Sequence, residues 1–118
     1  MALPNLKSPT AIYGKTARYA VTATLATALA APGTGKTFKI NSIFCANVDG
    51  TNAADISVSI YNGTTDFYLA KTITVPADAT QIISNKGTYF YLEEGDSIRA
   101  TGSHVSRLEL IIGYEDIS

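Results

Sequence analysis

The segment Gly35-Lys36-Thr37 is the first candidate for chemistry, because glycine-rich loops that end in Gly-Lys-Ser or Gly-Lys-Thr cradle nucleotide phosphates. The complete pattern begins with another glycine, but that position holds Ala30, for which a left-handed backbone costs about 1–2 kcal/mol. A phosphate loop also leads into a helix, whereas residues 38–48 are rich in β-branched and aromatic side chains without helical spacing. We therefore interpret the loop as a hairpin connection between two antiparallel strands, with Lys36 in solvent at its tip.

His104 is the only histidine, so two imidazoles cannot share a metal ion, and a Ser-His-Asp triad would have to use this residue. It lies in the segment TGSHVS, whose composition is typical of a surface turn. A solvated loop histidine is a simpler interpretation than a general base. A hydrolase would depend on His104 alone, and we expect no catalytic residues.

Two groups of side chains carry the oxygen atoms that a calcium site requires. Calcium loops place their donors at fixed alternating positions, and neither group has that spacing. Both are explained as polar turn residues between strands, so we expect no metal site and no cofactor. The two groups are Glu93, Glu94 and Asp96 around Gly95, and Asp49, Asn52 and Asp55.

The composition restricts the classes of partner. A protein of 118 residues is long enough for one domain with its own core. A net charge of -1 with 16% charged residues provides no basic surface for nucleic acid or an anionic membrane, so we expect neither as a partner. The single cysteine, Cys45, excludes an internal disulfide and a thiolate metal cluster, and its place beside Phe44 predicts a small buried residue.

Apolar and polar residues alternate in many short segments, which is typical of strands with one buried face. Residues 54–61 end at the turn signal Asn62-Gly63, and residues 67–75 end at Pro76. About eight such strands, without an amphipathic helix, predict an all-β fold, an antiparallel β-sandwich or jelly roll. The predicted inward residues of the three clearest strands are Ala54, Ile56, Val58, Ile60, Phe67, Leu69, Ile73, Val75, Leu108, Leu110, Ile112 and Tyr114.

Residues 19–29 also alternate, and we interpret them as one strand. A helix is an alternative, since Val21, Leu25 and Leu29 are spaced by one helical turn and alanine favours helix. A secretory signal is a second alternative, because basic residues precede this apolar stretch. Its threonines and its depth in the sequence favour the strand.

Residues 1–18 show no periodicity and contain Pro4 and Pro9. We interpret them as an extended N-terminal arm that orders only against a neighbour, and residues 19–118 as the β-sandwich domain.

The sequence is rich in tyrosine, and exposed aromatic side chains are enriched at protein interfaces. In the segment TYFYL, one sheet face must receive Tyr89 and Tyr91 and the other Phe90, so one of these sets points outward. The arm supplies further apolar residues that could order on a partner. The predicted partner-binding residues are Leu3, Leu6, Ile12, Tyr13, Tyr19, Tyr89 and Tyr91.

The order of segments over residues 19–115 resembles that of small virion structural proteins of tailed bacteriophages, including cyanophages. The shared scheme is a Pro-Gly turn with GKTFKI, an I-x-x-x-N strand, the strand SVSIYNG, a VPA turn and L-x-x-GDSI-x-A. The resemblance implies a β-sandwich that oligomerises and coats or extends a virion, and it implies no catalytic residues.

From these observations we hypothesise a capsid decoration, or cement, protein that binds and stabilises the phage head. We expect a homotrimer that contacts the major capsid protein or other virion proteins, located in the virion after assembly in the host cytoplasm. The alternative is a tail, neck or fibre component of the same virion. A carbohydrate-binding sandwich, with outward tyrosines stacked on sugars, is a third interpretation.

Overall fold

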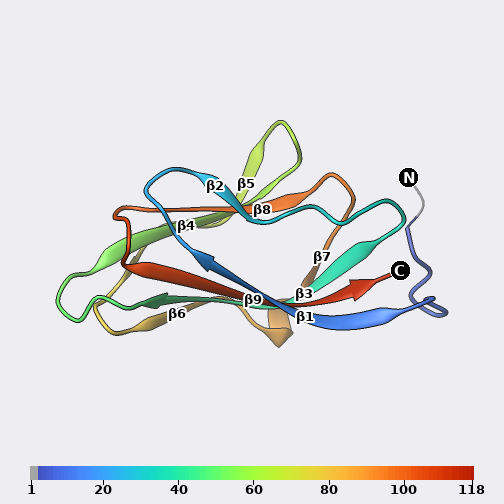
Figure 1. The fold of residues 1–118 in the computed structure, drawn as a ribbon, viewed down its shortest axis with the longest axis horizontal. Coiled ribbons are helices and arrows are strands. Elements are labelled where there is room, and N and C mark those ends of the chain that lie inside the picture. The colour runs from blue at the N-terminus through green and yellow to red at the C-terminus, as the bar shows by residue number, and fades with distance from the viewer. Residues whose placement is uncertain (1–2) are drawn as a thin grey trace.

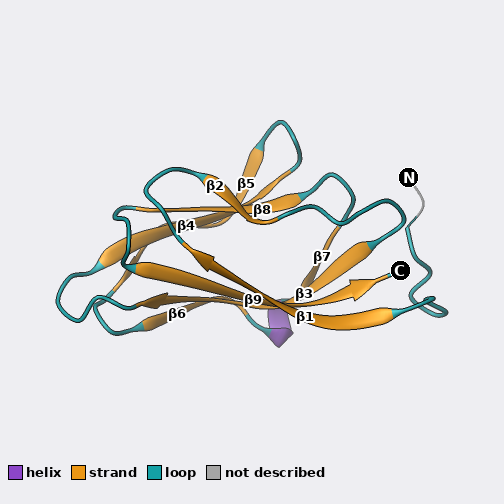
Figure 2. Ribbon diagram, viewed as in Figure 1, coloured by secondary structure: helices purple, strands orange, loops and turns teal. Residues whose placement is uncertain are grey.

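The computed structural model describes residues 3–118, which fold into two stacked antiparallel β-sheets (Figure 1). This confirms the all-β sandwich expected from the sequence. The elements of this range are β1 (Ile12–Ala20), β2 (Ala26–Leu29), β3 (Thr37–Asn47), β4 (Ala54–Tyr61), β5 (Asp66–Val75), β6 (Thr80–Ser84), a single 3-10 turn (Lys86–Thr88), β7 (Phe90–Leu92), β8 (Ser97–Gly102) and β9 (Leu108–Ile117). Figure 2 shows how strands and loops dominate the described residues.

The first sheet has the order β1-β9-β3-β6. β7 pairs with the first part of β3 and β6 with a later part of the same strand. The second sheet has the order β2-β8-β4-β5. None of the described residues forms a helix long and apolar enough to cross a membrane.

The core lies between the two sheets and is built from aliphatic side chains. Ile43 and Ile112 are opposite one another in the first sheet, and Val58 of the second sheet is equally inaccessible to solvent. Burial of each such residue contributes about 1.5–3 kcal/mol to folding. The predicted inward positions Ala54, Ile56, Val58, Leu108, Leu110 and Ile112 are confirmed as buried.

Cys45 is also buried in β3, as the sequence indicated. Burial raises the pKa of its thiol to about 11, since the thiolate would lose its hydration there.

The prediction of one strand over residues 19–29 is wrong, and so is its helical alternative. β1 ends at Ala20 in the first sheet, and β2 begins at Ala26 in the second. Between them the Thr22 hydroxyl accepts a hydrogen bond from the Thr24 amide and donates one to the Thr24 carbonyl. This local bonding by the threonine hydroxyl competes with the strand ladder and turns the backbone from one sheet to the other.

The loop of residues 30–36 is likewise not a hairpin connection, because it joins β2 of the second sheet to β3 of the first. A hydrogen bond from the Lys36 backbone amide to the Gly33 carbonyl closes its turn, and Gly35 has a left-handed φ of 74°. The Gly35 amide donates to the carboxylate of Glu94. Lys36 is exposed, as expected, and the strand β3 follows directly where a phosphate loop would begin a helix.

The boundary of the arm differs from the expected residue 18. Residues 12–20 form β1 and pair along their whole length with β9, from Ile12 opposite Ile117 to Ala20 opposite Glu109. Residues 3–11 lie outside the strands, and the backbone amides of Thr10 and Ala11 donate hydrogen bonds to the Ser118 carbonyl. The alternation in β1 escaped detection because most of its side chains are exposed and polar or small.

Of the predicted inward residues of β5, only Val75 is buried. Phe67 is 60% exposed, and Leu69 and Ile73 are also exposed. β5 is the edge strand of its sheet, and its register against β4 shifts twice. Phe67 and Ile73 are still opposite Ile60 and Ile56, which face the core, but the edge position leaves both of them open to solvent. Thr72 has a left-handed φ of 54° in this segment, and its amide donates to the Ser57 hydroxyl.

Candidate functional site

The start of β3, the strand β7 and the N-terminal segment enclose a surface depression at the end of the sandwich where both termini lie (Figure 1). Its volume is about 290 Å³. We call it the apolar hollow. It is lined by Leu3, Pro4, Leu6, Thr37, Tyr91 and Glu93.

Strand pairing explains why Tyr91 faces solvent at this place. β7 pairs with β3, with Tyr91 opposite Lys39, and its neighbour Leu92 is fully buried. The buried Thr37 hydroxyl donates to the Leu92 carbonyl at 2.9 Å and fixes β7 on β3. Because side chains alternate along a strand, burial of Leu92 directs Tyr91 outward, which resolves the ambiguity in TYFYL.

Tyr89 and Tyr91 form an aromatic pair beside the hollow. They are 49% and 40% exposed, while Phe90 is partly buried against the core. Their ring centroids lie 6.0 Å apart in an edge-to-face arrangement, and the Lys39 ammonium lies 4.5 Å from the Tyr89 ring centroid. The Lys39 ammonium also lies 3.9 Å from the Glu115 carboxylate. This pair is therefore a firmly held apolar surface with a charged border.

The structure brings together four of the seven predicted partner-binding residues. Leu3, Leu6 and Tyr91 line the hollow, and Tyr89 packs on Tyr91. Leu3 and Leu6 are 52% and 50% exposed. The sequence did not indicate Pro4, Thr37 or Glu93, because their contribution comes from folding rather than from any local pattern.

The other three predicted residues lie on β1. Ile12 and Tyr13 are exposed at its beginning, opposite Ile117 and Asp116. Tyr19 is partly buried near the end of the strand, where it packs against the core and lines a separate depression with Glu109 and neighbouring residues.

A second apolar group at the surface was missed. Ile82, Phe44 and Ile111 are opposite one another across β6, β3 and β9, so they form a row on the outer face of the first sheet. Ile82 and Ile111 are exposed, and Phe44 between them is partly exposed. Each of these residues is adjacent to another apolar residue in the sequence, so the sequence did not show which side chains would face the core and which the solvent.

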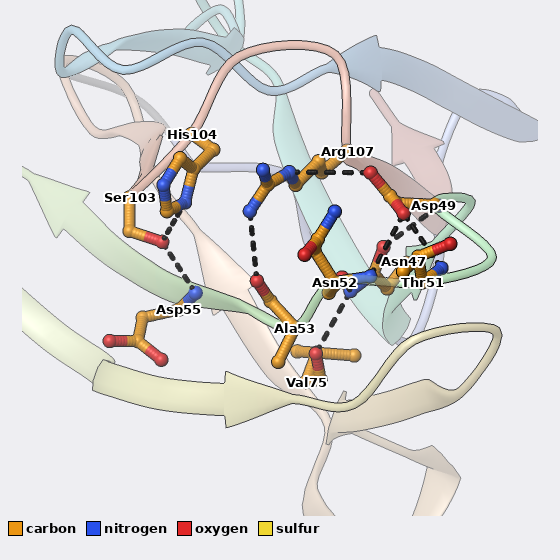
Figure 3. A network of polar contacts seen from close by, with 10 residues as sticks. All are labelled: Asn47, Asp49, Thr51, Asn52, Ala53, Asp55, Val75, Ser103, His104 and Arg107. Atoms are coloured by element: carbon orange, nitrogen blue, oxygen red, sulfur yellow. Dashed lines mark hydrogen bonds and ion pairs between the residues drawn. The ribbon is translucent and has the colours of Figure 1, made fainter.

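The opposite end of the sandwich carries a polar network (Figure 3). The side-chain nitrogen of the buried Asn47 donates hydrogen bonds to the backbone carbonyls of Asn52 and Val75, at 3.0 Å each. Its side-chain oxygen accepts a hydrogen bond from the Asp49 backbone amide. Arg107 lies 3.4 Å from the Asp49 carboxylate and donates to the Ala53 carbonyl. We call these contacts the loop-end network, because they bind the loops after β3, β5 and β8 to one another.

His104 is not arranged as a catalytic base. Its Nδ1 lies 3.1 Å from the Ser103 hydroxyl, and that hydroxyl accepts a hydrogen bond from the Asp55 backbone amide (Figure 3). The Asp55 carboxylate accepts from the Thr74 hydroxyl instead of orienting the imidazole. A triad needs the carboxylate on the histidine, so these residues stabilise a turn.

The acidic residues are also engaged in turns. The Glu94 carboxylate accepts a hydrogen bond from the Gly35 backbone amide. The Asp96 backbone amide donates one to the Glu93 carbonyl, across Gly95, whose backbone is left-handed. Among residues 3–118, no three His, Cys, Asp or Glu side chains are grouped so that they could hold a metal ion.

A charged pair crosses the outer face of the second sheet. Arg99 binds the Asp66 carboxylate at 3.0 and 2.7 Å, and the Ser59 hydroxyl donates to the same carboxylate. Burial raises the pKa of Asp66, but the bonds from Ser59 and Arg99 and the charge of Arg99 outweigh it and lower the pKa overall. The Arg99 guanidinium carbon also lies 3.9 Å from the Tyr61 ring centroid, so this pair is held by several internal contacts.

Two solved structures share the architecture of this protein. One belongs to the acidic stable capsid of the Helicobacter pylori bacteriophage KHP30, with a TM-score of 0.57 and 12% identity, and the match spans 94% of this protein and 90% of the capsid polypeptide. The other comes from Bacillus endospore appendages, which form disulfide-linked pili, with a TM-score of 0.54 and 14% identity, and the match spans 92% and 87%. No known protein family matches the sequence, and neither does any curated protein. At such identities the likeness shows a common fold.

Proposed function

We propose that this protein is a non-enzymatic structural component of a tailed-bacteriophage virion, and specifically a capsid decoration protein that binds and stabilises the head. The observation that carries the proposal is the fold, which aligns over 94% of this protein with a polypeptide of the KHP30 capsid. The segment order that resembles tailed-phage virion proteins points in the same direction. A structural role also agrees with the turn-stabilising contacts of His104.

The apolar hollow is the surface that we assign to attachment. Leu3 and Leu6 leave about half of their surface in water, and covering a leucine completely contributes about 1.5–3 kcal/mol. In the described part of the segment before Thr10, backbone amides bond only within the segment, from Ser8 to the Asn5 carbonyl and from Lys7 to the Asn5 side chain. This segment can therefore be repositioned on a partner without breaking the sandwich.

We further propose a homotrimer that attaches to the major capsid protein, in a particle assembled in the host cytoplasm. A trimer presents three hollows to one capsid surface, and linked weak contacts strengthen one another through effective concentration. Light scattering on the purified protein tests this proposal, and a stable monomer at all concentrations would contradict it.

Attachment is tested by co-sedimentation with heads that lack the protein. Deletion of residues 1–9 spares the bonds of Thr10 and Ala11 to Ser118, and it should abolish binding while the circular dichroism spectrum stays that of a β-sandwich. The double variant Leu3→Ser/Leu6→Ser should weaken binding by about tenfold or more. Val105→Ser is the matched control, because Val105 is also well exposed, in the loop before β9, and it should bind normally.

Unchanged binding of both arm variants would refute the role of the hollow. Binding to purified tails but not to heads would favour the tail, neck or fibre alternative. Tyr89 and Tyr91 also offer an exposed aromatic surface suited to sugar stacking. A change in tyrosine fluorescence with sugars, lost in Tyr91→Ala, together with no binding to particles, would favour a carbohydrate-binding function.

A further inference from the structure

The turn between β4 and β5 contains an asparagine, Asn62, whose side chain is hydrogen-bonded to the backbone of the turn. The Asn62 side-chain oxygen accepts hydrogen bonds from the amides of Thr64 and Thr65, at 2.9 and 2.7 Å. The backbone amide of Asn62 donates a hydrogen bond to the Thr65 carbonyl, and the Tyr61 hydroxyl donates one to the Gly63 carbonyl. Residues 62–65 are all exposed, so water has access to the turn.

The same turn presents a nucleophile beside the asparagine side chain. In an Asn-Gly sequence the glycine nitrogen can add to the γ-carbonyl carbon of the asparagine, and glycine has no side chain to hinder that approach. Among the hydrogen bonds of the described residues, none in this turn uses the Gly63 N–H. The oxygen of Asn62 would become negatively charged during this addition, and it already has two N–H donors, the arrangement of an oxyanion hole.

We propose that Asn62 is a site of spontaneous deamidation, and that the β4–β5 turn promotes the reaction. Hydroxide removes the proton of the Gly63 nitrogen, and this nitrogen then forms a bond to the γ-carbonyl carbon of Asn62. The bond between that carbon and Nδ2 breaks, and Nδ2 leaves as ammonia after taking a proton from water. Water opens the resulting five-membered imide at either carbonyl and produces aspartate or isoaspartate. The net reaction consumes one water and releases one ammonia, without an oxidant or reductant.

A second turn provides the internal control. Asp49-Gly50 has the same local pattern, since the Asp49 carboxylate accepts the amides of Thr51 and Asn52 at 2.8 and 2.9 Å. The hydrogen bonds from Asn52 and Thr51, with the charge of Arg107, lower the pKa of Asp49 and keep it ionised. A carboxylate is a poor electrophile, so we expect the matching turn to form the imide far more slowly.

Deamidation would change the edge of the second sheet. It places a carboxylate at the tip of the hairpin, one strand position from Asp66, which Arg99 already neutralises. The isoaspartate product also adds a carbon to the backbone and disturbs the bond from Asn62 to Thr65. The surface that the hairpin presents therefore becomes more acidic as the protein ages.

The test follows the folded, full-length protein over time in neutral and mildly alkaline buffer, with peptide mapping by mass spectrometry. Asn62 should deamidate about tenfold faster than Asn85, whose next residue Lys86 carries a side chain, a difference of about 1.4 kcal/mol in activation free energy. The rate should rise with pH and should be higher in the folded protein than in the urea-unfolded state, where the Thr64 and Thr65 donors are lost. Asp49 should stay free of isoaspartate.

Two variants test the chemistry and the geometry of the turn. Asn62→Gln should remove the fast reaction, because its longer side chain forms the cyclic imide much more slowly. Gly63→Ala should slow the reaction by about tenfold, since a methyl group hinders the nitrogen and, at the left-handed φ of 94° of this residue, also strains the turn. Reaction of Asn62 in urea but not in the folded protein would overturn the proposal, because the turn would then protect the side chain. Equal rates at Asn62 and Asn85 would overturn it as well.

Discussion

The two ends of the sandwich are built on different principles. The loop-end network is held by a buried Asn47 and the Asp49–Arg107 pair, and it joins the β3–β4 loop, the β8–β9 loop and the end of β5 (Figure 3). The other end exposes Leu3 and Leu6 beside an aromatic pair, and its N-terminal segment makes mostly local hydrogen bonds. One end is thus stabilised from within, whereas the other leaves apolar surface exposed, and there we propose that a partner attaches. Stability and attachment should respond to substitutions at opposite ends of the molecule.

The largest effect is expected for Asn47→Ala. Its side chain is buried, and its loss leaves the Asn52 and Val75 carbonyls and the Asp49 amide without their partner. We expect the free energy of unfolding to fall by about 3 kcal/mol, measured by urea denaturation. The control Asn5→Ala removes an asparagine side chain that bonds only to the nearby Lys7 amide, and should cost less than about 0.5 kcal/mol. Equal losses would contradict the proposed difference between the ends.

Arg107→Ala should have a smaller effect. It removes a partly exposed ion pair with Asp49 and a hydrogen bond to the Ala53 carbonyl, which together are expected to contribute about 1 kcal/mol. The matched control is Arg18→Ala, which removes an exposed arginine on β1. A loss for Arg18→Ala as large as that for Arg107→Ala, in the same denaturation experiment, would show that the loop-end network adds nothing specific.

Acid should weaken the loop end through Asp49. Its folded-state pKa lies below the ordinary value of 3.8, mainly because of the hydrogen bonds from the Asn52 and Thr51 amides. The folded protein therefore binds fewer protons than the unfolded state, and this contribution to stability is present above pH 3.8 and is lost as the pH falls through the folded pKa. Asp49→Asn should flatten the decline of unfolding free energy in that range. Asp66 titrates in both proteins, so the difference isolates Asp49.

The smallest effect on stability is expected at the hollow. Leu3→Ser/Leu6→Ser should change the free energy of unfolding by less than about 0.5 kcal/mol, because both side chains are half exposed in the isolated protein. The same variant should lose attachment to particles. A large loss of stability in thermal and urea denaturation would place these leucines in the structural core instead of a contact surface.

Much of the sandwich could be predicted from local patterns. β4 and β9 alternate over eight and ten residues, so most of their inward positions were correct. β1 and β5 failed for opposite reasons. β1 is an edge strand whose exposed residues carry little apolar signal, while β5 is an edge strand whose apolar residues Phe67, Leu69 and Ile73 stay exposed. Edge strands are covered on one side only, and their pattern is therefore a weak guide.

The candidate site could be predicted only in part. Tyr89 and Tyr91 were recognised because adjacent aromatic residues must face opposite sides of a sheet. The hollow itself depends on the approach of Leu3 to Tyr91, and the loop-end network joins Asp49 to Arg107. Contacts between residues so distant in sequence leave no local pattern, so only the folded protein shows them.

The position of β9 between β1 and β3 governs the order in which the protein can fold. Among the described strands β1 pairs with β9 alone, so it has no lateral partner until β9 is available, although Lys15 of β1 and its ion-pair partner Asp116 of β9 are 101 positions apart. Closing so long a loop precedes most of the gain from pairing, which makes folding slow for a protein of this size. During synthesis, β1 must therefore remain soluble without its partner until β9 has left the ribosome, and its exposed polar side chains suit it to that interval.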